Sequence, residues 1–411
     1  NSTFVGFAAG QGITGAKLTG NYNTAVGKDA GLLLQGAAAE NCIFGALAGD
    51  AITTGGENCL FGMGAGGSIQ TSIRNTFFGD DCGNTCTTGD SNVAMGHAAM
   101  GQGVTTGDFN VAIGFTAGAT LTSGTLNTVM GKNAGKSINT GANNTFVGAL
   151  AGDATDDGLN NTAVGYGALS ANCTNENVAV GASALLISTS GRNTAVGMGA
   201  GDANTTGGGN VYIGFECAAY QNDATSGADN TYVGAFARPS AATVGSEIAI
   251  GRYVLGQGTL TATLGVNGNG ATISIDGSDT SWAAHSDERL KENITTSTAG
   301  LSFINDLRPV TYTWKAKNAI SEDFVNYYDA DSTDPINGVA GKTYHGFVAQ
   351  EMKATIDAHS EVENGNNLWA ERVDDIQQLA PSNLVPMLVK AIQEQNALIE
   401  ALTARIEALE G

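Results

Sequence analysis

The chain has 411 residues, of which 59 are glycine and only 5 are proline, and its net charge is −21. Collagen needs abundant proline, so the glycine serves another architecture. The acidic balance argues against binding to nucleic acid or to anionic lipid, since both require clustered Lys and Arg. No apolar run approaches the roughly 18 residues of a transmembrane helix, so we expect no membrane insertion.

The composition changes sharply near residue 285. Residues 1–285 hold 53 glycines and 27 charged residues, whereas residues 286–411 hold 6 glycines and 30 charged residues in less than half the length. A shift of this size indicates a domain boundary. We predict four segments: a repeat rod at 1–258, connector strands that cap it at 259–285, a small α+β domain at 286–382 and a helix at 383–411.

A five-residue pattern recurs fifteen times in the first part: Asn, then Thr or Val in twelve copies, then two apolar residues and Gly, as in Asn144–Gly148. Asn stands four residues before the glycine in thirteen copies, and Ser2 and Glu247 replace it in the other two. The chain begins at Asn1 inside a copy, so we expect it to be a fragment of a longer protein. The fifteen glycines, mostly 16–18 residues apart, are at positions 6, 27, 45, 62, 79, 96, 114, 131, 148, 165, 181, 197, 214, 234 and 251.

A unit this short cannot fold alone and must stack on its neighbours. We therefore predict a mainly β fold, with one strand per copy in a β-solenoid or β-roll. The glycine ends the strand where the backbone needs a positive φ or a close approach. The Asn side chain satisfies turn backbone, and stacked copies form a ladder. At about 4.8 Å per strand, fifteen coils make a rod of roughly 70 Å.

The strand pattern also bears on oligomeric state. The two residues before each glycine are apolar in all fifteen copies, for example Ala25 and Val26. Adjacent strand residues point to opposite faces, so both faces of the strand require burial. One narrow solenoid has a single interior. The second face is therefore covered either by another chain, which we favour, or by loops of the same chain.

The cysteines follow the repeat. Cys42 and Cys59 occupy the Thr/Val position of neighbouring copies, and Cys82 and Cys217 occupy an Ala position three residues after the glycine. We interpret all four as small buried apolar residues. A bridge between Cys42 and Cys59 is conceivable. The pair Cys82 and Cys86 has no matching second pair, so we predict no metal site.

The repeats resemble the head repeats of trimeric autotransporter adhesins, and more closely the Asn-Thr-Ala-Val-Gly arrays of bacteriophage tail fibres. The period is longer than in the adhesins. The resemblance covers about residues 1–255 and implies a homotrimeric rod. Beyond it, the alternating residues 259–276 predict short strands.

A second resemblance begins at Ser286. The segments Ser286–Ile294, Leu307–Lys315, Gly346–Glu351 and Leu384–Glu394 resemble, in this order, the intramolecular chaperone domain of phage tailspikes, tail fibres and endosialidases. In that family the domain assembles a trimer and then releases itself by cutting the chain beside the serine. The resemblance implies a Ser-Lys dyad, with Ser286 as nucleophile, Lys291 as general base and the cut between His285 and Ser286.

The chemistry leaves alternatives at this site. A lysine can activate serine only if desolvation or nearby cations lower the lysine pKa. Five residues span 500° of a helix, so Ser286 and Lys291 cannot meet on a continuous one. Ser286 must then lie at a helix cap or in an extended lead-in. Alternatively, Ser286 only caps a helix whose positive end Asp287 and Glu288 favour, or His285 acts as the base.

The rest of the second part is read more simply. Tyr312, Trp314 and Trp369 are predicted core residues, and His345 is predicted to be structural. The cluster of Asp329, Asp331 and Asp334 lacks the remaining ligands of a calcium loop, which favours a solvated loop. The final helix carries heptads, with Ile392, Ile399 and Ile406 at a and Leu388, Gln395, Leu402 and Leu409 at d. Ile at a with Leu at d favours dimers, but the family resemblance implies a trimer, which we prefer.

We therefore predict a trimeric phage tail-fibre protein of the virion, made in the host cytoplasm. Its partners are two further copies, a host cell-surface receptor of glycan or outer-membrane type and other phage tail proteins, with no cofactor. The alternative is a bacterial trimeric surface adhesin that carries the same chaperone domain. An enzyme that cleaves host glycan is a third hypothesis; it needs paired carboxylates, for which the repeats offer only turn pairs such as Asp80–Asp81 and Asp156–Asp157.

Overall fold

The chain forms two compact units, Asn1–Ser286 and Asp287–Gly411. The computed structural model describes residues 1–13, 15–219, 224–278, 282–283, 286–324, 327–362, 368–372 and 375–410. No helix among these residues is both long and apolar enough to cross a membrane.

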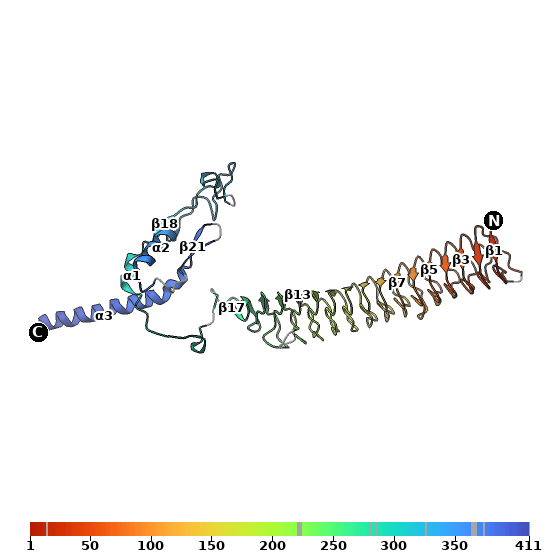
Figure 1. Cartoon of the computed structure of the whole chain (residues 1–411), viewed down its shortest axis with the longest axis horizontal. Coiled ribbons are helices and arrows are strands. Elements are labelled where there is room, and N and C mark those ends of the chain that lie inside the picture. Colours follow the sequence, from red (N-terminus) through yellow and green to blue (C-terminus); the bar gives the residue numbers. More distant parts are fainter. Residues whose placement is uncertain are drawn as a thin grey trace. The chain divides into compact units, whose positions relative to one another are not determined.

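The first unit is a β-solenoid, as predicted, with one three-residue strand in each copy of the repeat (Figure 1). Consecutive strands pair in parallel and in register, so that Thr145 lies beside Thr162 and Val147 beside Val164. The strands are β1 Thr3–Val5, β2 Thr24–Val26, β3 Cys42–Phe44, β4 Cys59–Phe61, β5 Thr76–Phe78, β6 Val93–Met95, β7 Val111–Ile113, β8 Thr128–Met130, β9 Thr145–Val147, β10 Thr162–Val164, β11 Val178–Val180, β12 Thr194–Val196, β13 Val211–Ile213, β14 Thr231–Val233 and β15 Ile248–Ile250.

The sheet ends in a hairpin. The predicted alternating stretch forms β16 (Thr261–Val266) and β17 (Asn269–Ser274). Strand β16 continues the parallel sheet beside β15, and β17 returns antiparallel to β16. The parallel stacking of the coils therefore stops here, because the chain has turned back on itself.

The interior of the rod is lined by two rows of buried residues that belong to one cluster. The central residue of each strand from β2 to β15 is at most 2% exposed, and so is the residue three positions after its strand-ending glycine, which is Ala or Cys in every coil but the last. The space around these rows is filled in two ways. In β9 the ring of Phe146 occupies the space beside Gly152, where an added Cβ would lie 2.4 Å from the ring. In β10 the central Ala163 is small, and Leu169 fills the corresponding space with 0% exposure.

The strand-ending glycines are required for the reason the repeat predicted. Their φ angles lie between +126° and +148°. A Cβ on Gly148 would come within 2.4 Å of the carbonyl oxygen of Gly165 in the next coil. Both a positive φ and a close backbone approach therefore exclude other residues.

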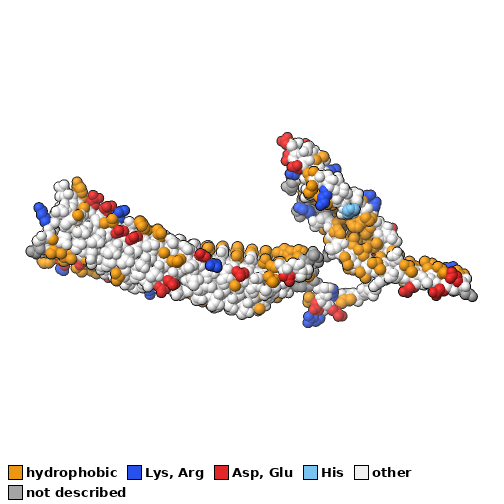
Figure 2. Space-filling model, turned by 180° about the vertical axis from the view of Figure 1, so that it is seen from behind, with side chains coloured by type: hydrophobic (Ala, Val, Ile, Leu, Met, Phe, Trp, Pro, Cys, Tyr) orange, Lys and Arg blue, Asp and Glu red, His pale blue; other side chains and the backbone are white. Residues whose placement is uncertain are grey.

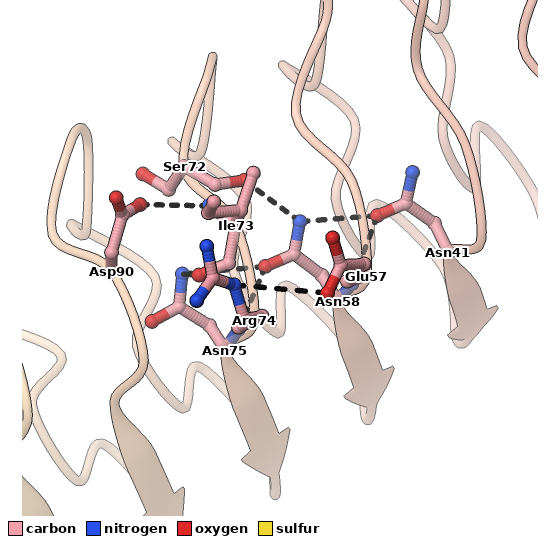
Figure 3. Close-up of polar contacts among 8 residues, drawn as sticks. All are labelled: Asn41, Glu57, Asn58, Ser72, Ile73, Arg74, Asn75 and Asp90. Carbon is pink, nitrogen blue, oxygen red and sulfur yellow. Dashed lines mark hydrogen bonds and ion pairs between the residues drawn. The ribbon is translucent and has the colours of Figure 1, made fainter.

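The predicted asparagine ladder is confirmed (Figure 3). The Nδ2 of Asn58 donates to Oδ1 of Asn41 at 3.0 Å and to the carbonyl oxygen of Ser72 at 2.9 Å. The backbone N–H of Asn58 also donates to Oδ1 of Asn41, at 3.2 Å. Each buried amide therefore joins its own coil to the preceding one and satisfies a turn carbonyl. At the far end Glu247 replaces Asn, and its carboxylate accepts from the hydroxyl of Tyr232 at 2.8 Å and from the N–H of Gly258 at 2.6 Å.

The second unit is a small α+β fold built on one core. The buried residues of this core are Ala299, Phe303, Met352, Ile356, Val362, Leu368 and Leu384. Its elements are the 3-10 turn η1 Glu288–Leu290, α1 Leu301–Asp306, β18 Val310–Tyr312, η2 Lys317–Ala319, β19 Tyr344–Gly346, α2 Ala349–Ala358, β20 Trp369–Glu371, β21 Gln377–Leu379, η3 Pro381–Leu384 and the 26-residue helix α3 Val385–Glu410. The pairs β18–β19 and β20–β21 are antiparallel.

Two expectations about the second unit need correction. Tyr312 and Trp314 are not core residues: each is 36% exposed, and their rings meet edge to face at 5.4 Å. Tyr312 ends β18 of a two-stranded sheet, and Trp314 follows two residues after that strand. Trp369 does pack against the core, although it is only half-buried.

Candidate functional site

The outer face of the rod sheet is apolar and uncovered by the chain itself. The first and third residues of each strand point away from the interior, and none of these thirty side chains is buried. Val5, Phe61 and Phe78 are 56%, 47% and 50% exposed. The alternative that loops of the same chain cover this face is therefore wrong. Figure 2 shows apolar side chains following one another along the rod.

Aromatic side chains stack from coil to coil on this face. The rings of Phe44 and Phe61 lie 5.6 Å apart and those of Phe61 and Phe78 lie 4.9 Å apart, in stacked geometry. The parallel in-register pairing produces the stack, because it repeats each strand position about every 4.8 Å. The third strand positions thus form an ordered row of exposed apolar side chains, and such a surface marks an interaction site.

Two of the cysteines lie on this face, which corrects their predicted burial. Cys42 and Cys59 are exposed, since they hold the first position of β3 and β4 and pair in register. Partial burial and the neighbouring Cys59 raise the pKa of the Cys42 thiol. Cys82 and Cys217 are buried as predicted, and so are Cys86 and Cys173. All six are free thiols.

The predicted cleavage segment is a short turn on the surface of the chain. Ser286 and Lys291 flank the 3-10 turn η1 and both are exposed. Asp287, rather than Ser286, caps this turn: its Oδ1 accepts from the N–H of Arg289 at 2.9 Å. Lys291 is the residue after the turn, and its N–H donates to the carbonyl oxygen of Glu288. The interpretation of Ser286 as a helix cap is therefore wrong, and Ser286 lies in the lead-in to the turn.

The electrostatics of the segment are local. The guanidinium and N–H of Arg289 hold the pKa of the Asp287 carboxyl below its usual range, and the two side chains form an ion pair at 2.6 Å. Both groups are exposed, so the pair contributes little to stability. His285, the predicted residue on the other side of the cut, lies outside the described residues. The Ser286–Lys291 dyad stays a prediction.

Further along, the last three of the quoted segments meet in the second unit. Arg308 and Glu351, from two different segments, form a bidentate ion pair that includes a 2.9 Å bond from Nε to Oε2. Strand β18 of the first of these segments pairs with β19 of the other. Leu384, from the last segment, is buried in the same core. Residues scattered over 100 positions of sequence therefore build one domain.

Sequence reasoning missed a histidine in this unit. His359 ends α2, and its Nε2 and Nδ1 lie 2.8 Å from Oδ2 of Asp306 and 2.9 Å from Oε1 of Glu361. The two carboxylates, Glu361 first, raise the pKa of His359. Its spacing from Glu361 was readable in the sequence, but the contact with Asp306 spans 53 residues and carries no sequence signal.

The other residues considered from the sequence, an Asp cluster and His345, do not form a recognisable binding site in the described part of the chain. Asp329, Asp331 and Asp334 are exposed in a loop, where the N–H of Asp331 donates to Oδ1 of Asp329. His345 is exposed on β19. Among the described residues no group of three or more His, Cys, Asp or Glu side chains is arranged to hold a metal ion.

The comparison with protein families matches residues 286–360, less than a fifth of the chain, to a peptidase family described as "Chaperone of endosialidase". The searches of curated proteins and of solved structures gave no match. The chain thus joins a β-solenoid rod to a region of the endosialidase-chaperone type. This is the architecture of a tail-fibre-like protein with an intramolecular chaperone.

Proposed function

We propose that the chain is part of a homotrimeric phage tail fibre, in which the rod reaches a receptor on the host surface. The second unit assembles the trimer and then detaches by cutting the chain between His285 and Ser286. The observation that carries this proposal is the family match, which begins at Ser286, where the rod unit ends.

The exposed sheet face supports the trimer. A monomeric rod would leave two rows of Thr, Val, Cys, Ile, Phe and Met in water along fifteen strands. Burying such a face contributes roughly 25 cal/mol for each Å² of apolar surface. The exposed apolar residues of α3 point the same way, since Ile392, Ile399 and Ile406 are 57%, 55% and 54% exposed. Two separate parts of the chain therefore present surfaces suited to copies of themselves.

The cleavage chemistry accounts for the order of events. Lys291 takes the hydroxyl proton of Ser286 as the Ser286 oxygen attacks the carbonyl carbon of His285. Lys291 then gives this proton to the peptide nitrogen of Ser286, the C–N bond breaks and an ester remains. Water hydrolyses the ester, which frees the His285 carboxyl group and restores the Ser286 hydroxyl. A lysine performs this role only when its ammonium is desolvated or lies near other cations. The exposed Lys291 of one chain gains that environment when further copies surround it. Assembly would then precede cutting.

The experiment is intact-mass and native-mass measurement on the whole chain, in wild type and in Ser286→Ala. A wild-type trimer whose chains end at His285, with an uncut trimeric mutant, supports the proposal. An uncut trimer in both would leave a permanently attached assembly domain and remove the Ser-Lys assignment. A monomeric, correctly folded wild type would remove the fibre proposal.

A pair of surface variants tests the interface independently. Val180→Asp together with Val196→Asp places charges on the outer face of β11 and β12, where the native side chains are 36% and 39% exposed. We expect the rod part of the trimer to dissociate. The control is Thr206→Asp, which adds a charge at an exposed turn of the same region. A rod part that stays trimeric in the double variant would place the interface elsewhere.

A further inference from the structure

The first backbone N–H of helix α1 donates a hydrogen bond to a side chain of α3. The residue before α1 is Gly300, which has no side chain to cap the helix. Instead, the N–H of Leu301 donates to Oε2 of Glu394 at 2.8 Å, across 93 residues of sequence. Lys390 lies 3.4 Å from the other carboxylate oxygen and steadies it. A hydrogen bond to a charged carboxylate is stronger and more directional than one between neutral groups.

Helix α3 divides into two parts along its length. Its first turns belong to the second unit, where Ala391 is buried and Glu394 contacts α1. From residue 395 to residue 410 every side chain is exposed, and the heptad residues Ile399 and Leu402 are 55% and 59% exposed. An isolated helix of this length is marginal in water, so copies of the same helix are the natural cover for this seam. Assembly therefore acts on the same helix that holds Leu301.

The segment that begins at Ser286 is exposed until it reaches this contact. Residues 286–298 are all exposed, and the first buried residues after them are Ala299 and Gly300. A Cβ on Gly300 would lie 2.4 Å from Oε2 of Glu394, so the backbone fits closely against the carboxylate. The residues that follow the cleavage segment are thus bound by the first half of α3, whose second half is exposed.

We propose that Glu394 is a positioning residue that couples association of α3 to the placement of residues 286–298, so that the chain is cut only after assembly. The inference rests on the proposed self-cleavage and adds its regulation. A coupling of this kind has a measurable size, because a link between two sites typically changes an equilibrium 5- to 150-fold. Without the link, the trimer would form and the segment would remain unplaced.

The first experiment compares whole-chain variants for trimer formation and for the rate of cutting. We expect Glu394→Ala to assemble as a trimer but to cut at least about fivefold more slowly than wild type. Glu394→Gln keeps an acceptor oxygen and should recover part of the rate. Glu400→Ala, on an exposed b position of the same helix, is the matched control and should cut at the wild-type rate. A wild-type rate in the Glu394→Ala trimer would overturn the proposal.

A second variant separates coupling from simple capping. Gly300→Asp in the Glu394→Ala background supplies a local cap to α1 without a link to α3. The removal of Glu394 also clears the two closest atoms to the new Cβ, and the Lys390 side chain, whose Cγ would lie 2.9 Å away, must shift slightly. We expect the thermal stability of the second unit to recover while cutting stays slow. Recovery of the cutting rate would show that Glu394 does no more than cap α1.

Hydrogen exchange distinguishes a failure of this inference from a failure of the proposed cleavage. In the trimeric Ser286→Ala chain, amides of residues 287–298 should exchange more slowly with Glu394 present than with Glu394→Ala. In the described part of the chain the amide that bonds to Glu394 is that of Leu301, which lies outside residues 287–298, so the loss of this bond does not by itself explain a difference there. If wild type is not cut but the exchange rates differ, the proposed coupling is supported and the proposed cleavage is contradicted. If the exchange rates are equal with Glu394 and with Glu394→Ala, the proposed coupling is contradicted.

Discussion

The rod and the C-terminal unit solve the problem of stability in opposite ways. In the rod every coil is held by the coil before and the coil after it, through the strand pairs and the Asn ladder. The second unit has one small core, and contacts such as Arg308–Glu351 and Leu301–Glu394 close over 43 and 93 residues. A stack of similar coils does not by itself determine where the solenoid ends or how many chains associate. The second unit, with its heptads, is suited to determine the number of chains.

The largest difference between the regions should come from a strand-ending glycine. Gly148→Ala places a Cβ about 2.4 Å from a backbone oxygen at a φ of +137°. We expect a loss of about 3 kcal/mol or more, because neither coil can move away without breaking its strand pairs. Denaturant unfolding of the whole chain, followed by the strand signal, measures it.

The control for this change is Gly167→Ala. This glycine has a φ of +60°, but the nearest atom to an added Cβ is 3.5 Å away. We expect a loss of about 1 kcal/mol from the backbone conformation alone. Equal losses at Gly148 and Gly167 would mean that the close approach between coils does not limit the rod.

The next effect concerns the ladder. Asn144→Ala removes the acceptor for the N–H of Asn161 and the donor to the carbonyl oxygen of Gly158, both buried in the rod. We expect a loss of about 2–3 kcal/mol, since each group left unsatisfied costs about 1–3 kcal/mol. Asn143→Gly, at an exposed position with a φ of +58°, should change stability little. A similar loss in both variants would contradict the structural role of the ladder.

Cysteine reactivity distinguishes the interior of the rod from its outer sheet face. In the chain dissociated by Val180→Asp and Val196→Asp, a maleimide should label Cys42 and Cys59 before unfolding. Burial raises the pKa of Cys82, Cys86 and Cys217 to about 12, so these thiols should stay unlabelled. In the wild-type trimer we expect all six to be protected. Rapid labelling of Cys42 in that trimer would show that its sheet face is not the interface.

The smallest effect is expected in the second unit and depends on pH. Contacts with Glu361 and Asp306 raise the folded-state pKa of His359 above 6.5. Their contribution to stability is therefore fully present below about pH 6.5 and is lost as the pH rises through the folded-state pKa. The melting temperature of the second unit should fall over that interval in wild type and not in His359→Gln. His345→Gln, an exposed control, should keep the wild-type dependence; the same slope in His359→Gln would exclude the contact as its source.

The rod was readable from sequence because its interactions repeat at short range. The strand residues, the Asn ladder and the need for glycine follow from a period of 16–18 residues, and each was found where the repeat placed it. The predictions of burial for Cys42 and Cys59 failed for a physical reason. A position in the repeat specifies which face a side chain takes, but a single chain does not show what covers that face.

The second unit was less readable because its contacts are long-range and unrepeated. The quoted segments were recognisable, and residues 286–360 match the family. The sequence did not reveal that the later segments share one core or that Tyr312 is exposed. It also did not reveal the hydrogen bond between Leu301 and Glu394. The alternative that Ser286 caps a helix also failed. Asp287 is the capping residue, because its carboxylate accepts a hydrogen bond from the N–H of Arg289.

The sequence by itself determined the repeat, the strand in each coil and the two-part organisation of this chain, because these depend on residues within one or two periods of each other. Only the tertiary structure decided which apolar face stays uncovered, which side chains close the second unit and which residue of α3 accepts the hydrogen bond of Leu301. Those outcomes depend on how distant parts of the chain pack. Many pairs of side chains could form such contacts as far as the local sequence pattern shows, and packing decides which pairs do.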